Sequence, residues 1–300
     1  MLALEIGGTH VRAALARGNG IIASRVVRWP KALSPESEVG FVAEVGQALL
    51  REHNLELHVR AAGVSAAALL DQSGTVVQWP NRPAWRGVSL RKLLQEYLGM
   101  QIVIEDDANA AALAEAVLGA GQEYHDLLVM TVGTGVGAGL ILNKSLFSGR
   151  NGWAGELGHL VMQRDGPPCP CGKRGCLQMM ASGRALERTA AAQGLENAEA
   201  VTEAAGRGET WAVEALAESG RWLGLAAANV VDLLDLQAVI VGGGLSVLGP
   251  PWWSSLEETL QANLINASHK RVALHRAALG DTAGLLGAVL LAEQLNGETS

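Results

Sequence analysis

A basic surplus is missing from this chain: 23 Lys and Arg residues stand against 30 Asp and Glu residues, for a formal net charge of -7. A nucleic-acid partner requires a positively charged face, so this balance argues against one. A nucleotide ligand stays open, because backbone amides and a divalent cation can balance phosphate charge. Aromatic residues are also scarce, at 4%, so the cores must be built from Leu, Val, Ile and Ala.

Nothing in the sequence has the pattern of an export signal or a membrane span. The apolar residues 1–4 follow no basic segment and are cut short by Glu5. The apolar stretch at residues 223–234 contains Asn229 and Asp232, which indicates a buried helix. We therefore expect a cytoplasmic protein without a membrane partner, and a length of 300 residues favours two domains.

Cysteine is nearly absent, and all three cysteines fall in one segment, Cys169-Pro-Cys171-Gly-x-x-Gly-Cys176. An odd, clustered set is a poor disulfide framework. Thiolates at this spacing fit three corners of a tetrahedral Zn²⁺ site, for which His159 is the nearest histidine as fourth ligand. A closed, structural zinc site is the prediction, and free buried thiols are the alternative.

Two hairpins with glycine-rich tips are predicted. Residues 2–16 form apolar strands around Gly7-Gly8-Thr9, and residues 127–142 repeat the design around Gly133-Thr134-Gly135. The repetition indicates an internal duplication of a mixed α/β layer. A further glycine run, Gly242-Gly243-Gly244, follows a predicted strand at residues 238–241.

The glycines have a purely conformational explanation, since tight turns use the positive φ that glycine tolerates. Two matching turns and a third glycine run favour phosphate binding instead, because such turns expose backbone N–H groups and allow close approach. Thr9 and Thr134 add hydroxyl donors.

The common nucleotide motifs do not fit. Gly133-x-Gly135-x-x-Ala138 matches a dinucleotide fingerprint formally, but that motif opens a helix, whereas the residues after Ala138 continue as a strand. The Gly-Lys-Ser/Thr of a Walker A loop is absent.

The remaining pattern predicts strands and helices in alternation. The segment at residues 148–177, rich in Gly, Pro and Cys, has no periodicity, which is typical of a functional or metal-organised loop. Strands are predicted at residues 60–70, 101–105 and 238–241, and helices at 108–118, 184–193, 197–205, 210–233 and 283–295.

Asp107 lies where a strand passes into a helix. Asp106, Asp107 or Asn109 could simply cap that helix. Alternatively, Asp107 stands at the carboxyl end of a strand, where α/β sheets place ligands, and accepts a proton from a substrate hydroxyl. Glu105 and Asp106 would raise its pKa unless a cation offsets them. The local sequence does not decide between these roles.

Together these motifs resemble the ROK family of sugar kinases and sugar-responsive repressors. The resemblance runs from residue 2 to about residue 288, through the glycine turns, Asp107-Ala-Asn-Ala-Ala, Gly155-Glu-Leu-Gly-His159 and the cysteine segment. It implies an α/β, actin-like ATPase (ribonuclease-H-like) fold, with two α/β domains around a cleft. We expect residues 1–118 with a C-terminal helix at 284–300 to form the smaller domain, and residues 119–283 the larger, zinc-containing one.

The resemblance also implies roles for individual residues. Asp107 corresponds to the base that takes the proton of the sugar 6-hydroxyl, and His159 to a residue that coordinates zinc and contacts sugar through different ring nitrogens. The nucleotide-binding set would be Gly7, Gly8, Thr9, Gly133, Thr134, Gly135, Gly242 and Gly243. The substrate-binding set would be Asn81, Asp106, Glu156, His159 and Gln178.

Four positions depart from the family pattern. Glu5 replaces the usual Asp of the first turn, and Asp106 replaces the Asn that often precedes the base. Ser65-Ala-Ala-Ala68 stands where Gly-x-Pro-Gly is typical, and Gln178 stands for a sugar-contacting Glu. Gln178 can hydrogen-bond, but it cannot accept from two donors as a carboxylate does.

The resemblance predicts an ATP–Mg²⁺-dependent kinase acting on a hexose 6-hydroxyl, with structural Zn²⁺ and a glucose-like substrate. N-acetylmannosamine or N-acetylglucosamine kinase activity is an alternative, and a non-catalytic sugar-binding or sugar-sensing protein is another. A repressor would carry a helix-turn-helix module before the first glycine turn, where we expect no room for one. Family members are commonly dimers, so we expect a homodimer.

Overall fold

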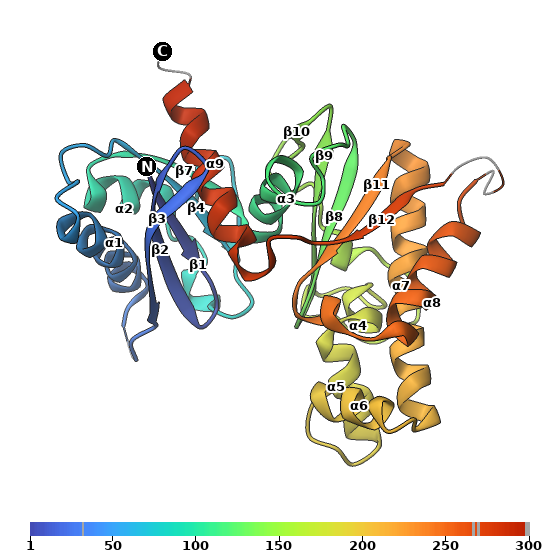
Figure 1. Cartoon of the computed structure of the whole chain (residues 1–300). Helices are drawn as coiled ribbons and strands as arrows, with labels where there is room; N and C mark the ends of the chain where they lie inside the picture. Colours follow the sequence, from blue (N-terminus) through green and yellow to red (C-terminus); the bar gives the residue numbers. More distant parts are fainter. Residues whose placement is uncertain (32, 266–267, 269–270, 298–300) are drawn as a thin grey trace. The chain divides into compact units, whose positions relative to one another are not determined.

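The computed structural model describes residues 1–31, 33–265, 268 and 271–297, so the last three residues of the predicted helix at 284–300 lie outside the described residues. The chain forms two compact α/β units (Figure 1). Unit 1 comprises Met1–Ala114, Leu146–Ala154 and Asp281–Ser300, and unit 2 comprises Glu115–Ser145 and Gly155–Gly280.

Unit 1 is built on a five-stranded sheet of order β3-β2-β1-β4-β7. The first three strands are antiparallel, whereas β1, β4 and β7 are parallel, so the carboxyl ends of these three meet at one edge. The strands are β1 (Leu2–Ile6), β2 (His10–Arg17), β3 (Gly20–Arg28), β4 (Ala61–Ala66) and β7 (Gln101–Asp106), with a separate pair β5 (Leu69–Leu70) and β6 (Val76–Gln78).

The two faces of this sheet are covered by different helices, as the period-2 alternation of strands requires. Leu2, Leu4 and Ile6 share a core with α1, whereas Ala3 packs with Ala288 of α9. A Cβ on Gly63 of β4 would lie 1.8 Å from the Ala288 carbonyl oxygen, so glycine is required there for α9 to approach. The helices are α1 (Pro35–Glu52), η1 (Pro83–Trp85), α2 (Leu90–Leu98), α3 (Asp107–Val117), η4 (Gly280–Thr282) and α9 (Ala283–Gly297).

Unit 2 has a sheet of order β10-β9-β8-β11-β12. Its main helical contact joins α7 and α8, where a Cβ on Gly220 or Gly224 would meet the carbonyl oxygens of Trp252 and Leu256. The elements are β8 (Leu127–Val132), β9 (Val136–Leu142), β10 (Ser145–Leu146), η2 (Leu157–His159), α4 (Gln178–Ala181), α5 (Gly183–Ala192), α6 (Ala198–Gly206), α7 (Thr210–Leu234), β11 (Ala238–Gly242), η3 (Gly244–Val247), α8 (Pro250–Ala262) and β12 (Ala273–Arg276).

The two sheets have the same design. In each sheet, an antiparallel hairpin comes first in the chain, and parallel strands reached by helical crossovers follow. The two strand orders, β3-β2-β1-β4-β7 and β10-β9-β8-β11-β12, correspond strand by strand. Both predicted glycine-tipped hairpins are present, as β1–β2 and β8–β9, in agreement with the predicted duplication.

Most predicted elements are found within a few residues of their expected bounds, and the segment at 148–177 is largely irregular. The elements that the sequence pattern missed include the strands β3 and β12 and the helices α1, α2 and α8. Among the described residues, no helix combines the length and apolar character that a bilayer crossing requires.

Candidate functional site

The first glycine turn lies between β1 and β2 in unit 1. It is closed by a hydrogen bond from the Gly7 N–H to the His10 carbonyl oxygen, at 3.0 Å. Neither Gly7 nor Gly8 has positive φ, so the conformational explanation for these glycines does not apply. At Gly8, lack of space explains the glycine, because a Cβ there would lie 3.1 Å from Asn81 Nδ2. The Asn81 amide therefore packs on the backbone of the turn.

Asp107 is the first residue of α3, at the carboxyl end of β7. The capping role belongs to its neighbour: the Ala108 N–H donates to Asp106 Oδ1 at 2.9 Å, and the Asn109 N–H to the same oxygen at 3.4 Å. The Asp107 side chain reaches solvent. Surrounding protein atoms strip part of its hydration and raise the pKa of Asp107, which helix N–H groups only partly oppose. An accessible carboxyl with a raised pKa suits a general base.

Further acidic groups lie on the same strands. Glu5, Ser65 and Glu105 pair in register across β1, β4 and β7. Burial raises the pKa of Glu5, Arg12 at 3.5 Å lowers it, and repulsion from Asp107 raises it again. Burial also raises the pKa of Glu105, which accepts hydrogen bonds from Asn109 and Ser148. This edge of the sheet thus concentrates negative charge beside the first glycine turn.

The second and third glycine runs meet within unit 2. Gly242 pairs with Thr131 at the end of β8, just before the turn at Gly133. Gly243 has φ of 84°, and a Cβ there would lie 2.5 Å from the Val132 carbonyl oxygen. Only glycine fits this conformation and this space. Thr134, at the tip of the second turn, is exposed.

Gln178 lies between the second turn and the cysteines. It is 8% exposed, and its Oε1 is 3.0 Å from where a Cβ on Gly135 would be. Its Nε2 donates to Cys169 Sγ at 3.1 Å. The amide nitrogen is therefore bonded to the cysteine cluster, and the amide oxygen lies close to the second turn.

The predicted metal ligands come together in unit 2. The ligand atoms of His159, Cys169, Cys171 and Cys176 all lie within 4.8 Å of one another. Sγ of Cys171 and Sγ of Cys176 are 3.7 Å apart. Zn–S bonds of about 2.3 Å in a tetrahedron place two sulfurs about 3.8 Å apart, so the donor set and its spacing fit zinc.

The surroundings shift the pKa values of the cluster's members in different directions. Burial and the neighbouring thiols raise the pKa of Cys176 to about 12. Burial opposes ionisation of Cys169, but hydrogen bonds from the Cys171 backbone and Gln178 outweigh it and lower its pKa. Burial, with Lys173 as a second cause, lowers the pKa of His159, which favours the neutral ring that a metal ligand requires.

The two ring nitrogens of His159 face different partners. Nδ1 is 3.7 Å from Cys169 Sγ, and Nε2 is 3.9 Å from Glu156 Oε2. One nitrogen thus faces the cysteines while the other lies beside a carboxylate, which is 45% exposed.

Two tryptophans that the sequence did not single out hold glycine-rich loops. Trp29 Nε1 donates to the Gly7 carbonyl oxygen at 2.9 Å, and Trp253 Nε1 donates to the Ser246 carbonyl oxygen at 3.0 Å. The available signal was the aromatic composition, with 8 Trp against 2 Tyr and 2 Phe.

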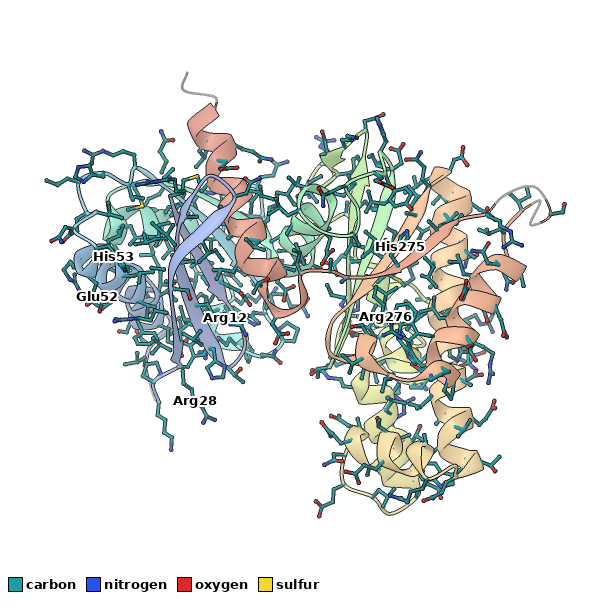
Figure 2. The ribbon with its side chains drawn as sticks, in the orientation of Figure 1. Arg12, Arg28, Glu52, His53, His275 and Arg276 are labelled. Carbon is teal, nitrogen blue, oxygen red and sulfur yellow. The ribbon has the colours of Figure 1, made fainter. Side chains whose placement is uncertain are left out.

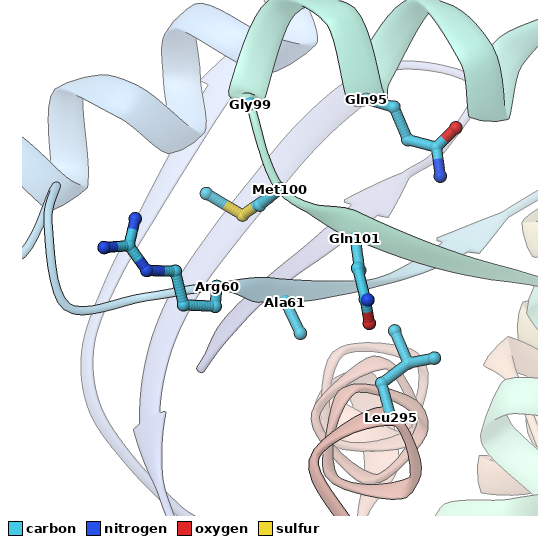
Figure 3. Close-up of a pocket in the computed structure, with 7 residues that line it drawn as sticks. All are labelled: Arg60, Ala61, Gln95, Gly99, Met100, Gln101 and Leu295. Carbon is cyan, nitrogen blue, oxygen red and sulfur yellow. The ribbon is translucent and has the colours of Figure 1, made fainter. Parts of the chain in front are cut away.

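A cavity of about 550 Å³ lies elsewhere in unit 1 (Figure 3). Ala61 and Gln101 stand at the amino-terminal starts of β4 and β7, the opposite ends from Asp107. It therefore takes no part in the candidate site. Its lining is Arg60, Ala61, Gln95, Gly99, Met100, Gln101 and Leu295.

Known proteins are similar to this chain over nearly its whole length. A sequence model of the ROK family matches residues 1–295. The glucokinase of Streptomyces coelicolor is 32% identical, covering 98% of this chain and 97% of the relative. The ROK hexokinase structure from Thermus thermophilus has a TM-score of 0.90 at 34% identity, covering 99% of each chain. A ROK family glucokinase from Streptomyces griseus, solved with glucose and AMPPNP, has a TM-score of 0.82 at 34% identity, over 98% of this chain and 99% of that one.

Proposed function

We propose that this chain, which belongs to the ROK family, is an ATP-dependent sugar kinase that phosphorylates the 6-hydroxyl of a hexose. The predicted family and the predicted actin-like, two-domain α/β fold are confirmed. Within this chain, the proposal depends mainly on the environment of Asp107. Its carboxyl is accessible at the end of a parallel strand, has a raised pKa, and is spared from capping by Asp106.

Asp107 is proposed to orient the sugar hydroxyl and take its proton as the oxygen attacks the γ-phosphoryl group in line. Because phosphoryl transfer has a loose transition state, most of the acceleration should come from positioning and charge neutralisation. Backbone N–H groups of the two glycine turns, with the hydroxyls of Thr9 and Thr134, would bind phosphate oxygens. Mg²⁺ would enter as the substrate complex with ATP.

The sugar is proposed to contact Asn81, Glu156 and His159. The Asp106 carboxylate accepts from two backbone N–H groups of α3, so it supports the base at least as much as it contacts sugar. Gln178 is engaged with Cys169 and lies against Gly135, so it would act on the sugar site through the cysteine cluster and the second turn.

Zinc is proposed to be structural, held by His159, Cys169, Cys171 and Cys176. Four protein ligands leave no open position for catalysis. The metal would fix the His159 ring and leave Nε2 to the substrate. Elemental analysis of protein purified without chelator should find about one zinc per chain.

The substrate is proposed to be glucose-like. A coupled ADP-release assay with glucose, N-acetylmannosamine and N-acetylglucosamine should give turnover with at least one, highest with glucose. Sugar binding by calorimetry without ADP release would instead identify a sugar-binding protein, which Gln178 in place of a carboxylate favours. The expected homodimer rests on the family resemblance, and sedimentation equilibrium tests it. The expected cytoplasmic location rests on the sequence pattern alone.

A further inference from the structure

A largely buried stack of side chains in unit 1 contacts the first glycine turn, and the proposed function gives it no role. We name it the Arg82 stack: Trp29, Glu38, Arg82 and Trp85. The guanidinium carbon of Arg82 lies 3.8 Å from the Trp29 ring centroid. Arg82 Nη1 also donates to Glu38 Oε1, and the two side chains are only 15% and 13% exposed.

Glu38 holds the stack together from α1. Its second carboxylate oxygen, Oε2, accepts from Trp85 Nε1, and Trp85 is 1% exposed. Both oxygens of Glu38 therefore have donors. A cation between a carboxylate and an aromatic face, largely removed from water, is held more strongly than the same contacts at the surface.

Trp29 connects this stack to the turn. Its Nε1 donates to the Gly7 carbonyl oxygen at 2.9 Å, and its backbone N–H donates to the Thr9 carbonyl oxygen at 3.3 Å. One residue therefore binds both ends of Gly7-Gly8-Thr9. The turn has little side-chain mass of its own, so these two bonds are a main external restraint on its backbone.

The residue before Arg82 contacts the same turn from another side. The Asn81 amide nitrogen lies 3.1 Å from the position of a Cβ on Gly8. Two consecutive residues thus bear on the turn, Asn81 by packing on Gly8 and Arg82 by stacking on Trp29. A displacement of Arg82 would move both.

We propose that Arg82 is a positioning residue for phosphoryl transfer. Its charge is balanced by Glu38, so its effect on the nucleotide is geometric: it clamps Trp29, and Trp29 fixes the Gly7 carbonyl and with it the N–H groups that face phosphate. This inference rests on the proposed kinase function. The expected size follows from transition-state positioning, where a misplacement of about 1 Å costs about a hundredfold in rate.

The same arrangement recurs independently in unit 2. Trp253 Nε1 donates to the Ser246 carbonyl oxygen at 3.0 Å, and the Arg276 guanidinium lies 4.1 Å from the Trp253 ring centroid. Arg276, labelled in Figure 2, also donates to the Ser246 carbonyl oxygen. Ser246 lies in η3, which begins directly after Gly243. In each unit, an indole N–H under a stacked arginine accordingly holds a carbonyl in a glycine turn or in the short helix that follows a glycine run.

Steady-state kinetics of Arg82→Met and Arg82→Lys, with ATP–Mg²⁺ and the best hexose, test the proposal. Arg82→Lys keeps a cation for Glu38, so it should fold even if Arg82→Met does not. We expect both folded variants to raise the ATP KM and lower kcat/KM for ATP by about tenfold to a hundredfold. Arg51→Met is the matched control, because the Arg51–Glu44 pair is also in unit 1 but its side chains are 50% and 58% exposed.

Tryptophan emission supplies a readout that does not depend on turnover. Arg82→Lys should change the Trp29 emission, measured as the difference between spectra in the Trp29 and Trp29→Phe backgrounds. Unchanged Trp29 emission together with wild-type ATP KM in folded Arg82→Lys would overturn the proposal. So would a fall in kcat that is fully accounted for by a smaller folded fraction, measured by circular dichroism, with the ATP KM unchanged.

Failure of the kinase function is distinguishable from failure of this inference. If the wild-type protein turns over no hexose, the proposed function fails. AMPPNP–Mg²⁺ binding by calorimetry then still tests Arg82, with a weaker affinity expected in Arg82→Lys than in Arg51→Met. Equal affinities would contradict the inference.

Discussion

The Gln178 side-chain amide donates to Cys169 Sγ at 3.1 Å, while its oxygen lies 3.0 Å from where a Cβ on Gly135 would be. One buried side chain thus connects the cysteine cluster to the second glycine turn. Ser182 Oγ donates to the Gln178 carbonyl oxygen at 2.5 Å, which fixes the backbone of the same residue. The proposed zinc ligands and the second glycine turn are therefore not independent.

Replacing Gln178 with Met should loosen zinc. Met is close in size but removes the N–H bond to the Cys169 thiolate, and loss of such an outer contact typically weakens metal affinity by about ten- to a hundredfold. Zinc release to a chromogenic chelator measures this. Gln163→Met is the control, since Gln163 lies in the same segment with an exposed side chain. Equal release rates in both variants would contradict the link.

Removing zinc should impair sugar binding before nucleotide binding. We expect chelation to lower the melting temperature, because the irregular segment around the cysteines depends on the metal. His159→Gln should raise the sugar KM by about ten- to a hundredfold, with a smaller change in the ATP KM. His53→Gln, an exposed histidine labelled in Figure 2, should change neither. A larger effect on ATP than on sugar would argue against the assigned role of His159.

Asp107→Asn should abolish most turnover. A general base typically contributes about 10²–10⁴-fold, so kcat for ADP release should fall by that factor while AMPPNP affinity stays close to that of the wild type. Asp165→Asn serves as the control, because its carboxylate is 87% exposed on a loop of unit 2. Near-normal turnover by Asp107→Asn with a confirmed sugar would remove Asp107 from the mechanism.

The same variant should be more stable at neutral pH. Because loss of hydration raises the pKa of Asp107 in the folded protein, ionisation costs folding free energy above that pKa and costs nothing below the unfolded pKa, near 3.9. Asp107→Asn should therefore raise the melting temperature at neutral pH, and the gain should shrink as the pH falls toward 4.

Asp71→Asn is the opposite case. The side-chain hydrogen bond from Ser73, with others from backbone N–H groups, lowers the pKa of Asp71, so its stabilisation is present above the unfolded pKa and lost as the pH falls. This variant should be less stable than the wild type at neutral pH, with a loss that fades in acid. If Asp107→Asn and Asp71→Asn changed the melting temperature in the same direction at neutral pH, loss of hydration would not be the cause of the effect at Asp107.

Gly243→Ala should destabilise the protein and weaken ATP binding. The φ of 84° and the Val132 carbonyl oxygen, 2.5 Å from the added Cβ, both oppose a side chain. Backbone strain of this kind costs about 1–3 kcal/mol of unfolding free energy. Gly244→Ala is a matched control, because a Cβ there meets nothing within 4 Å. Denaturant unfolding should give a lower free energy of unfolding for Gly243→Ala than for Gly244→Ala. Equal values would mean that the backbone at Gly243 adapts to a side chain without loss of stability.

Much of the fold could be predicted from local pattern. The hairpins around Gly7 and Gly133 were recognisable because strand alternation and turn residues lie together in single stretches, residues 2–16 and 127–142. The helices α1, α2 and α8 were missed. For α8 the deciding contacts are distant: Gly220 and Gly224 of α7 open the space that its backbone occupies.

The grouping of the chain into units also depended on distant contacts. Leu146–Ala154 belongs to unit 1, although it follows the second hairpin directly. Trp153 Nε1 donates to the Leu70 carbonyl oxygen at 2.6 Å, and Ser148 donates to Glu105. These bonds join residues more than forty positions apart, which no local periodicity indicates.

The sequence by itself determined the groups available: two glycine-tipped turns, a carboxylate after a strand, and three cysteines at a spacing that fits zinc. Each of these depends on residues a few positions apart, so local rules suffice. Only the tertiary structure decided that Asp106 caps α3 and leaves Asp107 accessible, that Gly243 lies against Val132, and that Arg82 stacks on Trp29. The first depends on side-chain geometry at a helix end, and the others on packing between segments far apart in the chain.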